Sequence, residues 1–209
     1  EGSRMTLTSE PAWGNKTKDM IEFWDMGLYR RDNDREWHGV TVYVLDGTGA
    51  GQSRNLVGCD GRTIELDKAW DINPDENSVI SIGKFNGRDI FDKNTFTDVG
   101  PSVQIYPPGY GCIISRNTIR RAVSANAGGQ ITNNRVEPNW FSEFVDNVVE
   151  QGNAWANESF LLHAYGTNDI NNMPIARGHI FRRNILKNNA TIRFQGAIAD
   201  IITEGNSIS

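Results

Sequence analysis

Four acidic side chains crowd around one tryptophan in the middle of the chain. Glu137, Glu143, Asp146 and Glu150 lie on either side of Trp140. Two carboxyl groups, one protonated and one ionised, can hydrolyse a glycosidic bond when they stand roughly 5 to 9.5 Å apart. We take Glu143 and Asp146 as candidate catalytic residues and Glu137 as a candidate binding residue. The alternative interpretation is that each acid is an ordinary surface charge.

A second set of polar residues recurs between apolar neighbours. Gln104 stands in Val-Gln-Ile, Ser124 in Val-Ser-Ala, His163 in Leu-His-Ala and Arg193 in Ile-Arg-Phe. Alternate residues of a strand point to opposite sides, so these four are expected to face outward in one column. His163 and Arg193 could transfer a proton, and Gln104 could bind substrate. They could equally be solvated positions on a sheet face.

Three aromatic residues accompany these polar groups. Trp140, Trp155 and Tyr165 have an apolar ring with one polar atom, which suits stacking on a sugar at a wet site. We expect them to bind substrate. Phe141 and Phe144 beside Trp140 are typical of a core, so packing is the competing explanation for the indole.

The sequence gives little support for a metal site, a disulfide framework or a nucleotide-binding loop. His38, His163 and His179 are far apart and lack the short spacing of a metal site, so we expect no metal centre. Cys59 and Cys112 do not suggest a disulfide framework. The Gly-rich phrase at residues 46–51 contains Gly-x-Gly-x-Gly, but no Lys-Ser/Thr or helical pattern follows it. It predicts a tight β-turn rather than a nucleotide loop.

The overall composition narrows the class of protein. The chain has 209 residues, a net charge of −5 and 21 glycines, with a mean hydropathy of −0.50. This is a globular chain with no membrane-spanning run, and its mild acidity argues against a nucleic-acid partner. The 20 Ile and 12 Val outnumber the 8 Leu, and there are 22 Asn. β-Branched residues favour strands and Asn favours turns, so the composition predicts an all-β fold.

An Asn-centred phrase repeats through the second half. It reads Ile-Phe-Asp-Lys-Asn-Thr-Phe at residues 90–96, Ile-Ile-Ser-Arg-Asn-Thr-Ile at 113–119 and Ile-Phe-Arg-Arg-Asn-Ile-Leu at 180–186. A copy at 201–208 has one extra residue, and weaker copies lie at 132–136 and 144–149. The repeated asparagines are Asn94, Asn117, Asn134, Asn147, Asn184 and Asn206.

The spacing of these asparagines predicts stacked coils. Two of the intervals, 94 to 117 and 184 to 206, are 23 and 22 residues, and the interval of 37 from 147 to 184 fits one coil plus a loop of about 15 residues. Each coil of a solenoid buries its apolar residues against its neighbours. The asparagines are expected to stack in register and hydrogen-bond along the axis, as amide ladders do.

The repeated Ile-Ile-x-x-Asn-x-Ile phrase, at about 22 residues, resembles the right-handed parallel β-helix of the pectin-lyase-like superfamily. The resemblance covers about residues 85 to 209. It is also similar to bacterial β-helix repeat proteins of carbohydrate-related type, in which a Gly-rich phrase like that at residues 46–54 precedes the coils. The Asp-Asp phrases of pectin hydrolases are absent from this sequence.

The first half is organised differently. Residues 40–45 are typical of a buried strand, and residues 62–66 and 78–82 alternate like half-buried ones. We expect residues 1–85 to form an irregular β-rich portion packed on the solenoid, and residues 86–209 to form the coils. The chain is expected to be one continuous domain and a fragment of a longer one.

These observations leave two function classes open. One is a secreted, periplasmic or surface enzyme that degrades a polysaccharide as a glycoside hydrolase or a lyase. A lyase would need a cationic base and acids that hold Ca²⁺, whereas a hydrolase would need no cofactor. The other is a non-catalytic glycan-binding or scaffold module, including the phage-spike type. In both, the expected partner is a polysaccharide or glycan, and the oligomeric state stays open.

Overall fold

The chain is built from strands. The computed structural model describes residues 3–8, 40–60, 62–84, 86–132, 135–150, 162–166 and 174–209, and in these ranges every regular element is a β-strand. No described element is a helix that could cross a lipid bilayer. Two compact units are present: residues 1–84 with 132–135, and residues 85–131 with 136–209.

The first unit contains an antiparallel sheet with the strand order β1-β4-β3-β2-β5. Its strands are β1 (Arg4–Thr6), β2 (Val40–Asp46), β3 (Ser53–Asp60), β4 (Thr63–Leu66) and β5 (Val79–Lys84). The Gly-rich phrase is the turn between β2 and β3, in which the N–H of Gly51 donates to Val44 O at 2.9 Å. The strands and the turn predicted from the sequence are present. They form an antiparallel sheet, because this tight turn returns the chain beside β2.

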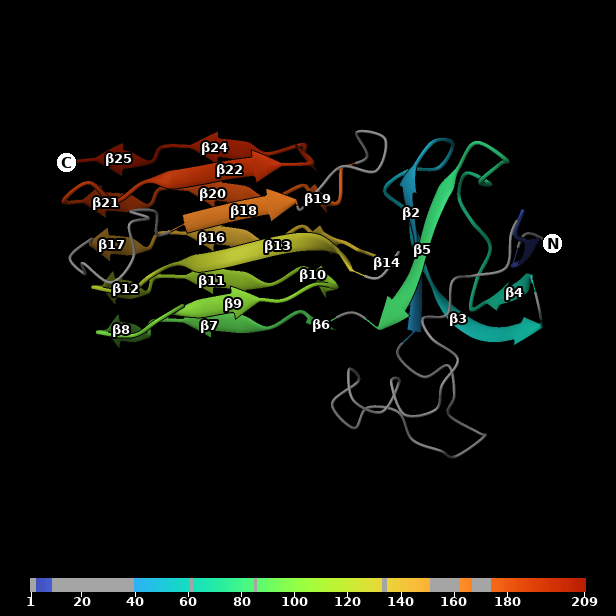
Figure 1. The fold of residues 1–209 in the computed structure, drawn as a ribbon, viewed down its shortest axis with the longest axis horizontal. Helices are drawn as coiled ribbons and strands as arrows, with labels where there is room; N and C mark the ends of the chain where they lie inside the picture. The colour runs from blue at the N-terminus through green and yellow to red at the C-terminus, as the bar shows by residue number, and fades with distance from the viewer. Residues whose placement is uncertain are drawn as a thin grey trace, which may run out of the picture. The chain divides into compact units, whose positions relative to one another are not determined.

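The second unit is a stack of coils, each made of short strands joined at corners (Figure 1). The first coil contains β6 (Asn86–Gly87), β7 (Ile90–Asp92), β8 (Thr95–Thr97) and β9 (Val103–Ile105). The second contains β10 (Gly109–Tyr110), β11 (Ile113–Ser115), β12 (Thr118–Arg120) and β13 (Ala125–Thr132), followed by β14 (Arg135–Glu137). The third contains β15 (Asn139–Trp140), β16 (Glu143–Val145), β17 (Val148–Glu150) and β18 (Leu162–Gly166). The fourth contains β19 (Ala176–Arg177), β20 (Ile180–Arg182), β21 (Ile185–Lys187) and β22 (Ile192–Gly196), and the fifth contains β23 (Ile198–Ala199), β24 (Ile202–Glu204) and β25 (Ser207–Ile208).

Equivalent strands of successive coils pair in parallel. The sheets run β23-β19-β15-β10-β6, β24-β20-β16-β11-β7 and β25-β21-β17-β12-β8. The fourth sheet has the order β14-β13-β18-β22, with β9 also paired to β13. Parallel pairing of strands that lie one coil apart is the pattern of a β-solenoid, so the predicted stacking of repeated phrases is confirmed.

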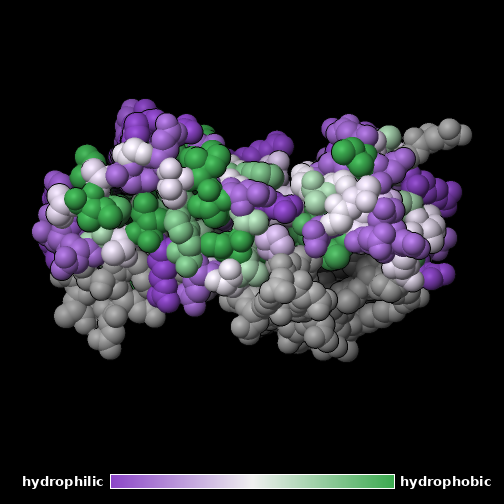
Figure 2. Space-filling model, turned by 90° about the horizontal axis from the view of Figure 1, so that it is seen from above, coloured by the Kyte–Doolittle hydropathy of each residue, from purple (hydrophilic) through white to green (hydrophobic). Residues whose placement is uncertain are grey.

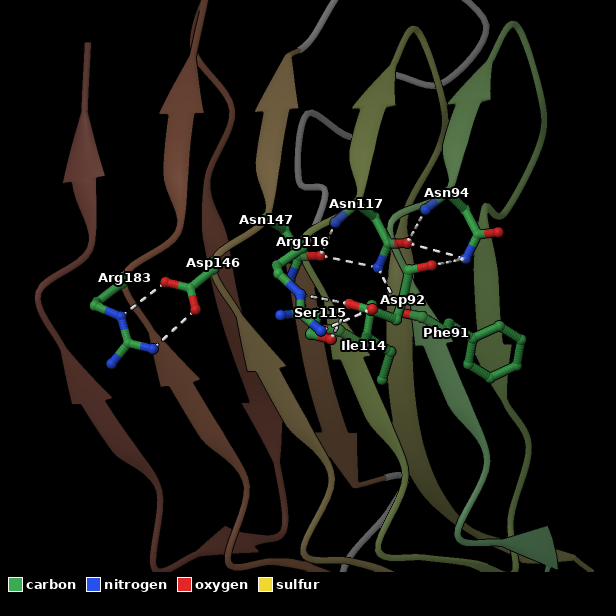
Figure 3. Close-up of polar contacts among 10 residues, drawn as sticks. All are labelled: Phe91, Asp92, Asn94, Ile114, Ser115, Arg116, Asn117, Asp146, Asn147 and Arg183. Carbon is green, nitrogen blue, oxygen red and sulfur yellow. Dashed lines mark hydrogen bonds and ion pairs between the residues drawn. The ribbon is translucent and has the colours of Figure 1, made fainter.

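A ladder of asparagine side chains runs along the stack (Figure 3). Asn117 Oδ1 accepts hydrogen bonds from the backbone N and the Nδ2 of Asn94, at 2.9 and 3.1 Å. Asn117 Nδ2 donates to Phe91 O at 2.8 Å and to Asn147 Oδ1 at 3.0 Å. The same bonds continue through Asn184 to Asn206. These side chains therefore satisfy backbone groups that the corner would otherwise leave unpaired inside the stack.

Successive asparagines of the ladder are separated by 23, 30, 37 and 22 positions in the sequence. The step of 37 is one coil with an insertion, as the sequence predicts. The step of 30 leads directly from Asn117 to Asn147. Asn134, which the sequence analysis places in the ladder, lies outside the described residues.

The corner before each ladder residue has a left-handed backbone. Positive φ angles occur at Lys93, Arg116, Asp146, Arg183 and Gly205, in each case one residue before the asparagine. A second corner column with positive φ consists of Arg88, Gly111, Phe141, Gly178 and Asp200. Such corners turn the chain sharply between strands of only two or three residues. Most hold a charged residue, which points its side chain outward and away from the core.

The interior of the stack is a column of apolar side chains. Ile114, Phe144 and Phe181 occupy equivalent positions of successive coils and are fully buried. The rings of Phe144 and Phe181 are parallel, with centroids 4.7 Å apart. Coils stacked in register bring like residues into contact, so this column gains both apolar burial and ring stacking.

Candidate functional site

One sheet of the coils carries most of the predicted outward polar groups. On β9, β13, β18 and β22, the strand register aligns Gln104, Asn126, His163 and Arg193. Two residues further along each strand, it aligns Gly128, Tyr165 and Gln195. We call the outward side of this sheet the polar face. Strands of a sheet lie about 4.8 Å apart, so the face presents polar groups at a regular spacing.

The observed column of aligned polar residues differs from the predicted one at one position. Asn126, not Ser124, lies level with Gln104 and His163. Ser124 stands before β13, in a turn where its carbonyl accepts hydrogen bonds from both N and Oγ of Ser102. The prediction was wrong here because a local apolar–polar–apolar pattern does not show where the strand begins. The aligned positions of Gln104 and Arg193 are as expected.

Asn126 is the most enclosed of the described side chains that are aligned on this face. It is 6% exposed, although Ala125 and Ala127 on either side of it face the core. Its Nδ2 donates to Ser124 Oγ at 2.9 Å, while its Oδ1 has no hydrogen-bond partner among the described residues. Sequence analysis missed this amide, because it sought the coil's polar residue two positions earlier.

Two tyrosines belong to the same face. The ring of Tyr165 lies directly over Gly128, where an added Cβ would stand only 2.0 Å from the ring. Burial raises the pKa of Tyr165, and the nearby phenol of Tyr106 adds to this effect. Tyr106 follows β9 directly and is 57% exposed. Because Gly128 has no side chain, the ring of Tyr165 can pack over its backbone, while the ring of Tyr106 faces solvent.

Tyr106 was not among the predicted binding residues. Its signal in the sequence was the continuing alternation of Val103, Gln104, Ile105 and Tyr106, in which the last residue again faces outward. Gln104 is exposed and Arg193 is half-buried. The backbone of His163 pairs between Asn126 and Arg193, and its side chain lies outside the description, as does Trp155.

The predicted catalytic acids lie elsewhere on the coils. Glu143 is the first residue of β16, in a sheet different from the polar face, and is aligned with Ile113 and Ile180. Asp146 lies at the corner after β16. The structure therefore does not bring Glu143 and Asp146 onto the sheet that carries Gln104 and Arg193.

Asp146 is held in an ion pair (Figure 3). Its two carboxylate oxygens accept hydrogen bonds from Nε and Nη2 of Arg183, at 2.7 and 2.8 Å. These hydrogen bonds from Arg183 lower the pKa of Asp146. An ionised carboxylate fixed in this way is suited to binding a cation and poorly suited to donating a proton.

Similar pairs join other coils. Arg116 binds both oxygens of Asp92 at 2.7 Å, and its hydrogen bonds, with that of Ser115, lower the pKa of Asp92 to about 2. The same bidentate arrangement joins Arg121 to Asp98. Further ion pairs join Arg120 to Glu150, Arg177 to Asp200 and Arg182 to Glu204. Most of the described carboxylates of the coils thus neutralise arginines of a neighbouring coil.

The remaining predicted residues have structural surroundings. Glu137 accepts a hydrogen bond from Gln130 Nε2 at 2.8 Å. Trp140 is 0% exposed and its indole contacts Phe141 edge-on, with centroids 5.8 Å apart. A ring enclosed in this way presents no face to a sugar. Phe141 in turn contacts Tyr110 edge-on.

His179 is buried in the interior. Its Nδ1 accepts a hydrogen bond from the backbone N of Ser142 at 3.1 Å, and it is 0% exposed. Burial lowers the pKa of His179 to about 4, so the ring is neutral at pH 7. This histidine contributes to packing and to the hydrogen bonding of the corner before β16. Among the described residues, no three His, Cys, Asp or Glu side chains converge as a metal site requires.

No protein-family model, curated protein or solved structure matches this chain. The site is therefore interpreted from its own geometry. That geometry favours the polar face as the candidate binding site, because amides, a guanidinium and two phenols lie there on adjacent strands.

Proposed function

We propose that this protein is a glycan-binding β-solenoid module that holds a polysaccharide along its polar face. The observation that carries the proposal is the alignment of Gln104 and Arg193 on strands of one sheet, with Tyr106 and Tyr165 beside them. Amide side chains both donate and accept hydrogen bonds, as sugar hydroxyls require. The tyrosine rings supply apolar surface for the faces of sugar rings.

Three carboxylates at the corners and strand ends of the coils favour a binding function over cleavage. Hydrolysis needs one carboxyl that holds a proton near neutral pH and a second one nearby. Asp92, Asp98 and Asp146 are instead ionised partners of arginines, with lowered pKa values. We therefore place the non-catalytic interpretation ahead of a polysaccharide-degrading enzyme.

The proposal extends to ancestry and location. Because connections between parallel strands of one sheet are nearly always right-handed, we infer a right-handed coil. The asparagine ladder and the steps of 22 and 23 residues support kinship with the pectin-lyase-like superfamily. A polysaccharide partner implies a secreted, periplasmic or surface-attached protein.

The test is binding to a panel of neutral and acidic polysaccharides by affinity electrophoresis and calorimetry. Tyr106→Ala should weaken binding about tenfold, since an aromatic contact contributes up to about 1.5 kcal/mol. Gln104→Ala should also weaken it. Thr95→Ala is the matched control, because Thr95 is exposed on β8 of the same coil but in another sheet.

Turnover is measured on the same panel. Release of reducing ends would show hydrolysis, and growth of absorbance at the wavelength of unsaturated uronates would show elimination. Binding that Tyr106→Ala weakens, without turnover, supports the proposal. Turnover would replace it with the enzyme interpretation. Binding that Thr95→Ala weakens as much as Tyr106→Ala would refute the assignment of the face.

A further inference from the structure

A histidine ring is enclosed in the interior of the coils. His179 is 0% exposed, while Figure 2 shows hydrophilic residues gathered around the outline of the coils, with apolar residues between them. Because Nδ1 of His179 accepts a hydrogen bond from the backbone N–H of Ser142 at 3.1 Å, the neutral ring carries its proton on Nε2. Nε2 is buried and has no hydrogen-bond partner among the described residues. The surroundings therefore fit a neutral ring and not a charged one.

Hydrogen bonds lead from this histidine towards the polar face. Ser142 Oγ donates to Asn139 Oδ1 at 3.2 Å, and Asn139 Nδ2 donates to Ile105 O at 3.0 Å. Ser142 and Asn139 are 0% exposed, as His179 is. The amide of Asn139 lies against Gly109, where an added Cβ would stand 2.6 Å from Nδ2. The path from His179 to Ile105 is thus a continuous set of buried hydrogen bonds.

The path ends on β9, the strand that carries two exposed residues of the polar face. Ile105 lies between Gln104 and Tyr106 and is itself only 5% exposed. Its carbonyl is bound by Asn139 from the interior, while the side chains before and after it face solvent. A shift of this carbonyl would therefore change where Gln104 and Tyr106 present their polar atoms.

The groups around His179 do not compensate a charge on its ring. In the column of equivalent positions, Ile201 follows His179 on the next coil, and Cys112 lies two coils before it. Burial raises the pKa of the Cys112 thiol, so it is neutral in acid. The charged neighbours in sequence and in the next coil, Arg177 and Asp200, pair with each other at 2.8 Å.

Acid favours an open form of this corner. Burial lowers the pKa of His179 to about 4, and the backbone hydrogen bonds of Ser142 and Asn139 raise it by less. A histidine released to solvent titrates near 6.5, so the open form binds the proton more tightly. The opening equilibrium therefore shifts towards the open form as the pH falls below 6.5, by up to about 300-fold at pH 4.

We propose that His179 makes the polar face sensitive to acid, so that the protein binds its glycan at neutral pH and releases it in an acidic medium. A proton from solvent, taken up at Nδ1, turns this atom from an acceptor into a donor that faces the N–H of Ser142. Two donors at this distance repel each other, so the corner before β16 opens. The ligand in this proposal rests on the proposed function, whereas the opening does not.

The opening reaches β9 through the buried hydrogen bonds. When the corner moves, Ser142 Oγ leaves Asn139 Oδ1, and the amide of Asn139 is no longer fixed against Ile105 O. Gln104 and Tyr106 then lose the fixed positions in which they meet the glycan. His179 is thus a positioning residue for the polar face, because it acts only through Ser142 and Asn139.

The experiment follows the full 209-residue chain by nuclear magnetic resonance from pH 7 to pH 4. The imidazole signals report the protonation of His179, and the amide signals of Gln104 and Tyr106 report the state of β9. We expect these amide signals to move with the midpoint of the His179 titration. They should stay in place in His179→Gln, because the amide oxygen of glutamine can accept from Ser142 and does not titrate.

Ser142→Ala is the matched variant that separates the histidine from β9, and it also serves if His179→Gln does not fold. It removes the hydrogen bond to Asn139 but keeps the backbone N–H that contacts His179. The imidazole should still titrate, while the amide signals of Gln104 and Tyr106 no longer follow it. Amide signals that move alike in the parent and in Ser142→Ala would overturn the proposal. So would parent signals that stay in place while His179 titrates, or unfolding of the whole chain, seen by circular dichroism, before they move.

Glycan binding is measured on a neutral polysaccharide, which has no group that titrates in this range. Between pH 7 and pH 4 the affinity of the parent should fall at least ~10-fold, and that of His179→Gln less than about twofold. An equal fall in both proteins would overturn the release in acid. If no polysaccharide binds at pH 7, the proposed function fails, whereas the amide signals still decide whether β9 follows His179.

Discussion

The interior asparagine Asn147 offers the sharpest test of the ladder. Its Oδ1 accepts from the N and Nδ2 of Asn117, both at 3.0 Å, and its Nδ2 donates to Ile114 O at 2.8 Å and to Asn184 Oδ1 at 3.0 Å. The residue is 0% exposed. Asn147→Ala removes all four hydrogen bonds and leaves two donors of Asn117 without their partner, the backbone N–H and one Nδ2 proton.

The cost follows from these unpaired groups. Each buried donor left without a partner costs about 1–3 kcal/mol, so Asn147→Ala should reduce the free energy of unfolding by at least ~2 kcal/mol. Asn94→Ala is the matched control, because Asn94 is exposed at the first coil. It removes one hydrogen bond to Asn117 Oδ1, which still accepts from the backbone N of Asn94 at 2.9 Å. We expect a loss of no more than about 1 kcal/mol there.

The assay is urea unfolding followed by far-ultraviolet circular dichroism. Midpoints are compared between variants with equal slopes, since the slope reports the surface exposed on unfolding. Hydrogen exchange of β16 and β17 provides a local readout within the same variants. If Asn147→Ala and Asn94→Ala shift the midpoint equally, the ladder contributes nothing beyond its exposed end, and the reasoning is refuted.

Three other perturbations test the interior, the corners and the polar face. Because burial lowers the pKa of His179 to about 4 while an unfolded histidine titrates near 6.5, the unfolded state binds the extra proton. Stability should be complete above pH 6.5 and fall by up to about 3 kcal/mol as the pH drops to 4, and His179→Gln should flatten this dependence in urea midpoints. Arg183→Gln leaves a half-exposed Asp146, so its midpoint should shift less than that of Asn147→Ala, and the shift should shrink in high salt. Gly128→Ala should displace the ring of Tyr165, which lowers that phenol's pKa in a spectrophotometric titration and weakens glycan binding, whereas Gly100→Ala, which meets no atom within 4 Å, should do neither.

The sequence predicts the repeated structure well because the fold repeats a local requirement. Each corner leaves backbone groups that only a side-chain amide at one position satisfies, so the asparagine recurs even where the strands vary. The steps of 22, 23 and 37 residues could be recognised from this phrase. The step of 30 could not, because an excursion between two coils adds residues without changing the register. Phrases such as that around Asn134 therefore match the pattern without evidence that they occupy a corner.

The candidate site is less predictable for a related reason. Pairs such as Asp146 and Arg183 lie 37 residues apart, and their contact depends on the length of everything between them. A sequence shows that acids cluster around Trp140, but not that an arginine of the next coil neutralises one of them. The outward column was easier to predict, since alternation within one strand fixes the side of Gln104 without knowledge of its neighbours.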